Sequence, residues 1–99
     1  MQSLPKRWRM VEYKIIFSKL AEKDKKLLKQ AGLENKTKEL LDLMLINPYQ
    51  APPPYEKLKG NLSGCFSRRI SYQHRLVYMV DENNKEIFVL RMWTHYDKL

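Results

Sequence analysis

The second half of the sequence interleaves basic side chains with aromatic side chains and with both histidines of the chain. Cations can contact phosphates and flat rings can stack on bases, so this pattern is typical of an RNA- or DNA-binding surface. A solvated face of a small basic domain would look similar, and we expect no more than that from the lysines of residues 19–31. The residues concerned are Tyr55, Lys57, Lys59, Arg68, Arg69, Tyr72, His74, Arg75, Tyr78, Lys85, Arg91, His95, Tyr96 and Lys98.

Glu56, His95 and Tyr96 are the residues whose chemistry fits RNA cleavage. A histidine can move a proton near neutral pH, and a phenol can donate a hydrogen bond or a proton to an oxyanion. Cleavage without a metal needs a base for the 2′-OH proton, cations on the scissile phosphate and an acid for the leaving 5′-oxygen. From the residues alone, a His-Tyr pair near a terminus is more often structural than catalytic.

The sequence offers no pattern for a metal or a nucleotide cofactor. Its single cysteine and its two histidines lack the spacing of zinc ligands, and its acidic residues do not cluster. With three glycines in the chain there is no Gly-rich phosphate loop, which argues against nucleotide triphosphate chemistry. We therefore expect neither a metal nor a cofactor.

Four arginines stand among apolar residues, namely Arg68, Arg69, Arg75 and Arg91. A charge placed among core residues is costly unless another group pairs with it. The partner of each arginine is either a structural carboxylate or a substrate phosphate, and composition does not choose between the two.

The hydrophobic pattern predicts the elements that would position these residues. Residues 11–17 alternate as in a half-buried strand. Two helical patterns follow, the first capped by Ser18 and ended by Gly32, the second ended before Pro48. The predicted ranges are helices at 19–31 and 33–46, a proline-rich spacer at 47–55, strands at 65–71, 74–80 and 86–93, and a hairpin turn at 81–85.

This order of one strand, two helices and a meander of strands predicts an α+β fold. We expect the two helices to cover one face of an antiparallel sheet. The sequence leaves nothing to cover the other face, and on a basic protein that face is where a polyanion would lie.

Length and charge limit the class of protein. Ninety-nine residues support one domain, which we place at residues 11–99 after a basic arm at residues 1–10. The net charge is 19 − 11 = +8, which points to a polyanion or an acidic protein as partner. The longest apolar run is far shorter than a membrane span, and residues 1–10 lack the apolar region of a secretory signal. A lone cysteine, Cys65, fits a reducing cytoplasm.

Residues 56–78, which read E-K-L-K-G-N-L-S-G-C-F-S-R-R-I-S-Y-Q-H-R-L-V-Y, resemble the YoeB/Txe family of bacterial toxins within the RelE/ParE superfamily. The core N-L-S-G-x-x-S-R-R-I-x-x-x-H-R-L-V-Y is long and specific, and His95-Tyr96 falls where that family ends in His-Tyr. The resemblance covers about residues 10–96. It implies a microbial RNase-like fold with two N-terminal helices packed on one face of a twisted antiparallel sheet, in agreement with the order above.

The resemblance also implies an activity and partners. The family's members are toxins of type II toxin–antitoxin systems that act as ribosome-dependent mRNA interferases, cleaving mRNA in the A site by metal-independent 2′-OH attack. The implied partners are the 70S ribosome with its mRNA and a cognate acidic YefM-like antitoxin, whose C-terminal segment wraps the toxin. Dimers are known among relatives, so a homodimer is a further expectation, although no motif here marks an interface.

Four site residues carry over from the family position by position. Glu56 matches the general base and Arg75 matches the arginine that stabilises the phosphate. His95 matches the residue assigned to general acid or phosphate contact, and Tyr96 matches the residue that orients the scissile nucleotide.

Lys59 and Arg69 match further basic residues of the family's site. The chain departs from close relatives at Gln73, where they carry Glu just before H-R-L-V-Y. Because Gln cannot act as a base, there are two alternatives. Either this position only supports the site, or the enzyme depends more on Glu56 as its base. The arm at residues 1–10 and the tail at residues 97–99 are two further departures from the family pattern.

Two other functions fit the same fold. One is a ParE-like non-catalytic inhibitor of DNA gyrase, although such relatives lack the Glu, Arg and His-Tyr combination that stands here. The other is a plain RNA-binding protein, for which the basic strands suffice.

Overall fold

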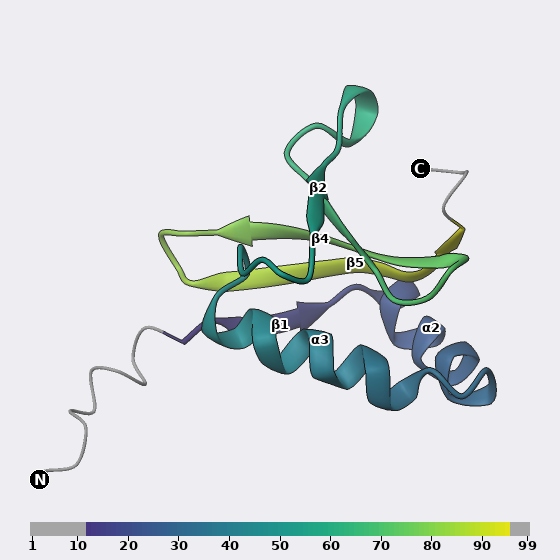
Figure 1. The fold of residues 1–99 in the computed structure, drawn as a ribbon. Coiled ribbons are helices and arrows are strands. Elements are labelled where there is room, and N and C mark those ends of the chain that lie inside the picture. The colour runs from purple at the N-terminus through teal and green to yellow at the C-terminus, as the bar shows by residue number, and fades with distance from the viewer. Residues whose placement is uncertain (1–11, 96–99) are drawn as a thin grey trace, which may run out of the picture.

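The structure is a computed structural model that describes residues 12–95, with His95 described through its backbone only. The predicted arm at residues 1–10, Tyr96 and the tail at residues 97–99 lie outside the described part. The elements in chain order are β1 (Lys14–Phe17), α2 (Lys19–Gln30), α3 (Glu34–Ile46), β2 (Tyr55–Lys57), a 3-10 turn η1 (Gly60–Leu62), β3 (Phe66–Arg69), β4 (His74–Asp81) and β5 (Glu86–His95) (Figure 1).

The five strands form one sheet in the order β1-β5-β4-β3-β2. Strands β2, β3, β4 and β5 pair with one another in antiparallel fashion, as the meander pattern predicted. The edge strand β1 instead pairs with β5 in parallel, with Lys14 opposite Glu86 and Phe17 opposite Val89. The sheet is therefore mixed, and the expectation of an antiparallel sheet holds for four strands of the five. Parallel neighbours need a long connection, which here contains both helices and the other three strands.

The two helices begin and end close to the predicted residues. The Ser18 hydroxyl caps α2 by accepting a hydrogen bond from the Ala21 amide at 3.0 Å, and it donates to the Leu90 carbonyl at 2.7 Å. At the other end of α2, Gly32 has φ +75°, a left-handed conformation that turns the chain into α3 at low steric cost. The cap thus sets both the start of α2 and its position against β5.

The hydrophobic core lies between the helices and one face of the sheet, and Figure 1 shows both helices on the same side of the strands. It holds the fold mainly through burial of apolar side chains. Its members are Ala21, Leu28, Leu40, Met44, Ile70, Leu76, Tyr78, Ile87, Val89 and Met92. No helix among residues 12–95 is long and apolar enough to cross a membrane.

The sheet face turned away from the helices is less open than predicted. Ser67, Arg75 and Val77 are buried, whereas Met79 further along β4 is exposed. Arg75 precedes the core residue Leu76, so the two-residue period of a strand directs it away from the core. The polar residues of this face therefore lie in a partly enclosed site, not on a flat surface.

Asp24 connects α2 to β5 from a buried position that the sequence did not reveal. The side chain is 4% exposed, and its Oδ2 accepts hydrogen bonds from the Met92 amide at 2.8 Å and from Arg91 Nε at 3.0 Å. Of the two partners predicted for Arg91, the structure thus shows the structural carboxylate. The neighbouring lysines of α2, Lys23 and Lys26 among them, are exposed as expected.

Replacing Asp24 with alanine is expected to lower the free energy of unfolding by about 3 kcal/mol. The buried Met92 amide would lose its acceptor, and the Arg91 guanidinium would lose its counter-charge. Urea unfolding followed by circular dichroism measures the change. Asp42→Ala is the matched control, because Asp42 pairs with Lys38 in an exposed contact that solvent screens. Equal losses in the two variants would contradict the role assigned to Asp24.

Candidate active site

Strands β2, β3 and β4 bring Glu56, Ser67 and Arg75 into direct contact. Glu56 lies opposite Ser67 in the β2–β3 register, and β4 runs along the other side of β3. Arg75 Nη1 donates to Glu56 Oε1 at 2.7 Å and to Ser67 Oγ at 2.8 Å. Two residues that the sequence singled out, Glu56 and Arg75, are therefore adjacent although 19 positions separate them.

The two charged partners differ in their exposure to solvent. The Arg75 side chain is 5% exposed, whereas the Glu56 side chain is 56% exposed. The guanidinium is held in one orientation by neighbouring strands, and the carboxylate faces the solution from which a substrate would arrive. A fixed cation beside an accessible carboxylate is an arrangement that can neutralise a phosphate and accept a proton.

Three further predicted site residues are exposed and lie close to Glu56 or Arg75 in the chain or in the strand register. Arg69 is exposed and stands directly opposite Arg75 in the β3–β4 register. Lys59 is exposed and directly precedes η1, three residues after Glu56. Gln73 is exposed in the turn between β3 and β4, where its backbone amide donates to Ser71 Oγ at 3.3 Å. Arg69 thus lies beside Arg75 on the neighbouring strand, and Gln73 lies two residues before Arg75 in the chain.

The topology also carries the backbone of His95 toward the same end of the sheet. In the β4–β5 register Thr94 lies opposite Arg75, and His95 lies opposite His74. The backbone of His95 is therefore one position away from the pair that contains Arg75. The roles predicted for the His95 side chain and for Tyr96 stay predictions, because these side chains lie outside the described part of the structure.

Sequence reasoning missed Ser67 as a polar residue of the site, and it placed His74 in a nucleic-acid-binding surface, whereas the structure buries it. Ser67 is fully buried and accepts a hydrogen bond from Arg75, and His74 is buried with its ring stacked on Trp93 at a centroid distance of 3.8 Å. Both are polar residues within strands, and both belong to the S-R-R-I and H-R-L-V-Y segments quoted above. Their place within these strand segments was the signal in the sequence, since a buried polar side chain in a strand needs a partner.

Arg68 has neither of the partners that the sequence predicted for it. It is 1% exposed, and its Nη atoms donate to three backbone carbonyls of the proline-rich loop, those of Pro53 at 2.7 Å, Gln50 at 2.8 Å and Pro48 at 3.0 Å. Its guanidinium also lies over the Tyr55 ring at 5.1 Å. Arg68 thereby fixes the loop that leads into β2, and so fixes the backbone that carries the candidate general base.

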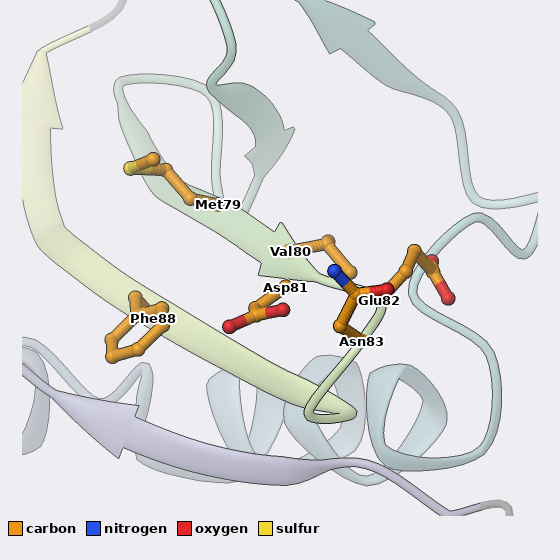
Figure 2. Close-up of a pocket in the computed structure, with 6 residues that line it drawn as sticks. All are labelled: Met79, Val80, Asp81, Glu82, Asn83 and Phe88. Atoms are coloured by element: carbon orange, nitrogen blue, oxygen red, sulfur yellow. The ribbon is translucent and has the colours of Figure 1, made fainter.

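The opposite end of the β4–β5 hairpin has a different character. A hollow there is lined by Met79, Val80, Asp81, Glu82, Asn83 and Phe88, and Figure 2 shows these side chains along the end of β4, in the turn and on β5. Hydrogen bonds from Asn84 lower the pKa of Asp81, and hydrogen bonds from Tyr49 and Tyr13 lower the pKa of Glu82. Both carboxylates are therefore charged at neutral pH, and the lining has no cation. This end does not suit a polyanion, which leaves the Arg75 end as the candidate active site.

Comparisons with known proteins give a consistent result. Residues 15–96 match the family profile of the YoeB-like toxin of bacterial type II toxin-antitoxin systems. The chain is 36% identical to a Toxin YoeB of Synechocystis over 75 residues, which cover 76% of this chain and 78% of that protein.

Two solved structures from Staphylococcus aureus share the fold. One is a heterotetrameric YoeB-YefM toxin-antitoxin complex, whose matching chain is 39% identical with a TM-score of 0.71, covering 85% of this chain and 98% of that one. The other is a YoeB dimer, 37% identical with a TM-score of 0.71, covering 86% of this chain and 99% of that one. The predicted two-helix α+β fold is thereby confirmed.

Proposed function

Because the chain belongs to the family of YoeB-like toxins of bacterial type II toxin-antitoxin systems, we propose that it is a ribosome-dependent endoribonuclease that cleaves mRNA in the A site. The observation that carries this proposal is the contact of buried Arg75 with exposed Glu56 and with Ser67. A DNA-gyrase inhibitor or a plain RNA-binding protein has no need for a carboxylate held beside a buried arginine.

The proposed reaction uses the nucleophile that RNA carries. Glu56 accepts the proton of the 2′-OH, the 2′-oxygen forms a bond to the neighbouring phosphorus, and the bond from phosphorus to the 5′-oxygen breaks. His95 donates a proton to the leaving 5′-oxygen, and Tyr96 orients the scissile nucleotide. The products are a 2′,3′-cyclic phosphate and a 5′-hydroxyl, so atoms and charges balance without a metal or a cofactor.

Arg75 supplies the electrostatic part of the proposed mechanism. Its guanidinium is already desolvated and oriented by Ser67, so it needs little reorganisation when negative charge develops on the phosphate. The arriving phosphate competes with Glu56 for Nη1, which releases the carboxylate for the 2′-OH. Lys59 and Arg69 contact phosphates on either side, and Gln73 supports the site as a hydrogen-bonding side chain and not as a base.

The proposal includes partners of defined chemistry. A net charge of +8 suits both ribosomal RNA and an acidic YefM-like antitoxin, and the related toxin from Staphylococcus aureus is solved in complex with YefM. The solved YoeB dimer supports a homodimer in the same way. Translating ribosomes place this activity in the cytoplasm, where the lone Cys65 would stay reduced.

Glu56→Ala tests the proposed function. We expect A-site cleavage of a translated mRNA, mapped by toeprinting, to fall by about 10²–10⁴-fold, because general-base catalysis contributes a factor of this size. Glu34→Ala, which alters an exposed carboxylate of α3, is the matched control and should cleave like the wild type. Undiminished cleavage by Glu56→Ala would refute the role of Glu56. Inhibition of gyrase supercoiling by a wild type that leaves mRNA intact would refute the function itself.

A further inference from the structure

The turn between β3 and β4 presents one aromatic ring to solvent. Tyr72 is 85% exposed. The turn around it is well ordered by hydrogen bonds, since the Ile70 and Ser71 amides both donate to the His74 carbonyl, at 2.9 and 3.1 Å. The Ser71 hydroxyl in turn accepts from the amides of Gln73 and His74. The backbone that carries Tyr72 is therefore held in place while its side chain projects outward.

A groove of about 580 Å³ lies between this turn, α3 and the proline-rich loop. Its size falls within the range of small-ligand sites, and it is large enough for one nucleobase. Its lining includes two cations, Arg69 and Lys36, and one carboxylate, Glu39, and the leucines and prolines of the lining are apolar. The lining residues that matter here are Tyr72, Arg69, Lys36, Glu39, Leu40 and Pro54.

Arg69 links the groove to the candidate active site. Arg69 lines the groove and also stands opposite Arg75 in the β3–β4 register. Tyr72 is three residues from each of these arginines, so its backbone lies within about 10 Å of both. An RNA strand whose scissile phosphate contacts Arg75 would therefore pass the groove with a neighbouring nucleotide.

We propose that Tyr72, Arg69 and Lys36 form a subsite for an RNA nucleotide that flanks the cleaved one. The base stacks on the Tyr72 ring, and the phosphate is held by the two cations. This inference rests on the proposed function and assigns a binding role to Tyr72 and Lys36. Because it flanks the cleaved nucleotide, the bound nucleotide belongs to the mRNA.

Tyr72→Ala and Tyr72→Phe test the subsite, with Ile46→Ala as the control for loss of an exposed apolar side chain of α3. On programmed ribosomes we expect Tyr72→Ala to raise KM by about tenfold with kcat nearly unchanged, because stacking on an aromatic ring is lost. Tyr72→Phe retains the ring and should behave like the wild type. All three variants should unfold at the wild-type temperature, since both positions are exposed.

Two binding measurements identify the source of the nucleotide and separate this inference from the proposed function. One probe is a short single-stranded RNA that carries 2-aminopurine and a 2′-deoxy block at the cleaved position; the other is the empty 70S ribosome. Weaker binding of Tyr72→Ala to the oligonucleotide supports the subsite, whereas weaker binding to the ribosome alone would assign Tyr72 to ribosomal RNA and overturn the proposal. Wild-type binding in both measurements would also overturn the subsite. A wild type that binds but does not cleave would refute only the nuclease function.

Discussion

Arg75→Ala is expected to abolish translation-dependent mRNA cleavage, with kcat/KM lowered by about 10³-fold or more. Arg75 is the buried cation of the site, and both protons of its Nη1 point to named partners, Glu56 and Ser67. Water that fills the space of a lost guanidinium is not oriented toward the developing charge on the phosphate. His95→Ala is expected to reduce cleavage as well, because the leaving 5′-oxygen would lack its acid.

Several variants separate a loss of chemistry from a loss of structure. Arg75→Ala leaves Glu56 largely exposed to water but removes the donor of the buried Ser67 hydroxyl, so the free energy of unfolding should fall by about 1–3 kcal/mol and cleavage is measured well below the unfolding temperature of the variant. Arg75→Lys keeps the charge without the planar fork and should retain a small part of the activity. Lys29→Ala, at an exposed position of α2, is the control and should cleave normally. Full cleavage by purified protein that carries both Arg75→Ala and His95→Ala would refute the assignment.

Arg68→Met is expected to have the largest effect on stability, lowering the free energy of unfolding by about 3–5 kcal/mol. The substitution preserves much of the side-chain volume but removes the donors from three carbonyls of residues 48–53. These bonds are charge-assisted and lie in or near the buried interior, where an unsatisfied acceptor is costly. A domain of this size is stable by only about 5–15 kcal/mol, so the loss is a large fraction of the total.

Urea unfolding measures this effect, and the expected fall in the midpoint is about 2 M or more. Arg69→Ala is the matched control, because the neighbouring arginine is exposed and should contribute less than about 1 kcal/mol. Below its unfolding temperature Arg68→Met should also cleave less mRNA, since the loop that leads to Glu56 is no longer fixed. A midpoint equal to that of Arg69→Ala would show that Arg68 does not hold the loop.

Much of the fold follows from the hydrophobic pattern. The helices begin and end within one or two residues of the predicted bounds, because Ser18 and Gly32 carry local signals that tertiary structure does not override. Strand β2 escaped prediction, since three residues are too few to show a two-residue period. The parallel pairing of β1 with β5 also escaped, because alternation shows which face a residue takes but not the direction of its neighbour.

The candidate site could be predicted only in part. Glu56 and Arg75 were singled out from the family motif, and the contact between them is a property of the strand register that composition does not encode. Arg68 shows the limit most clearly, since every residue offers a backbone carbonyl and no sequence pattern marks the three that face inward. Asp24 was overlooked for a related reason, because it stands among solvated lysines on α2 and is buried only through its contact with β5.

The central claim is that this chain cleaves mRNA on the ribosome through the 2′-OH of the RNA. The most direct measurement uses ribosomes programmed with two mRNAs that differ only by a 2′-deoxy substitution in the A-site codon, with cleavage mapped by primer extension. We expect scission of the unmodified mRNA, with a 2′,3′-cyclic phosphate on the upstream fragment, and no scission of the substituted one. Equal cleavage of both mRNAs, or cleavage of neither by folded wild-type protein, would contradict the claim.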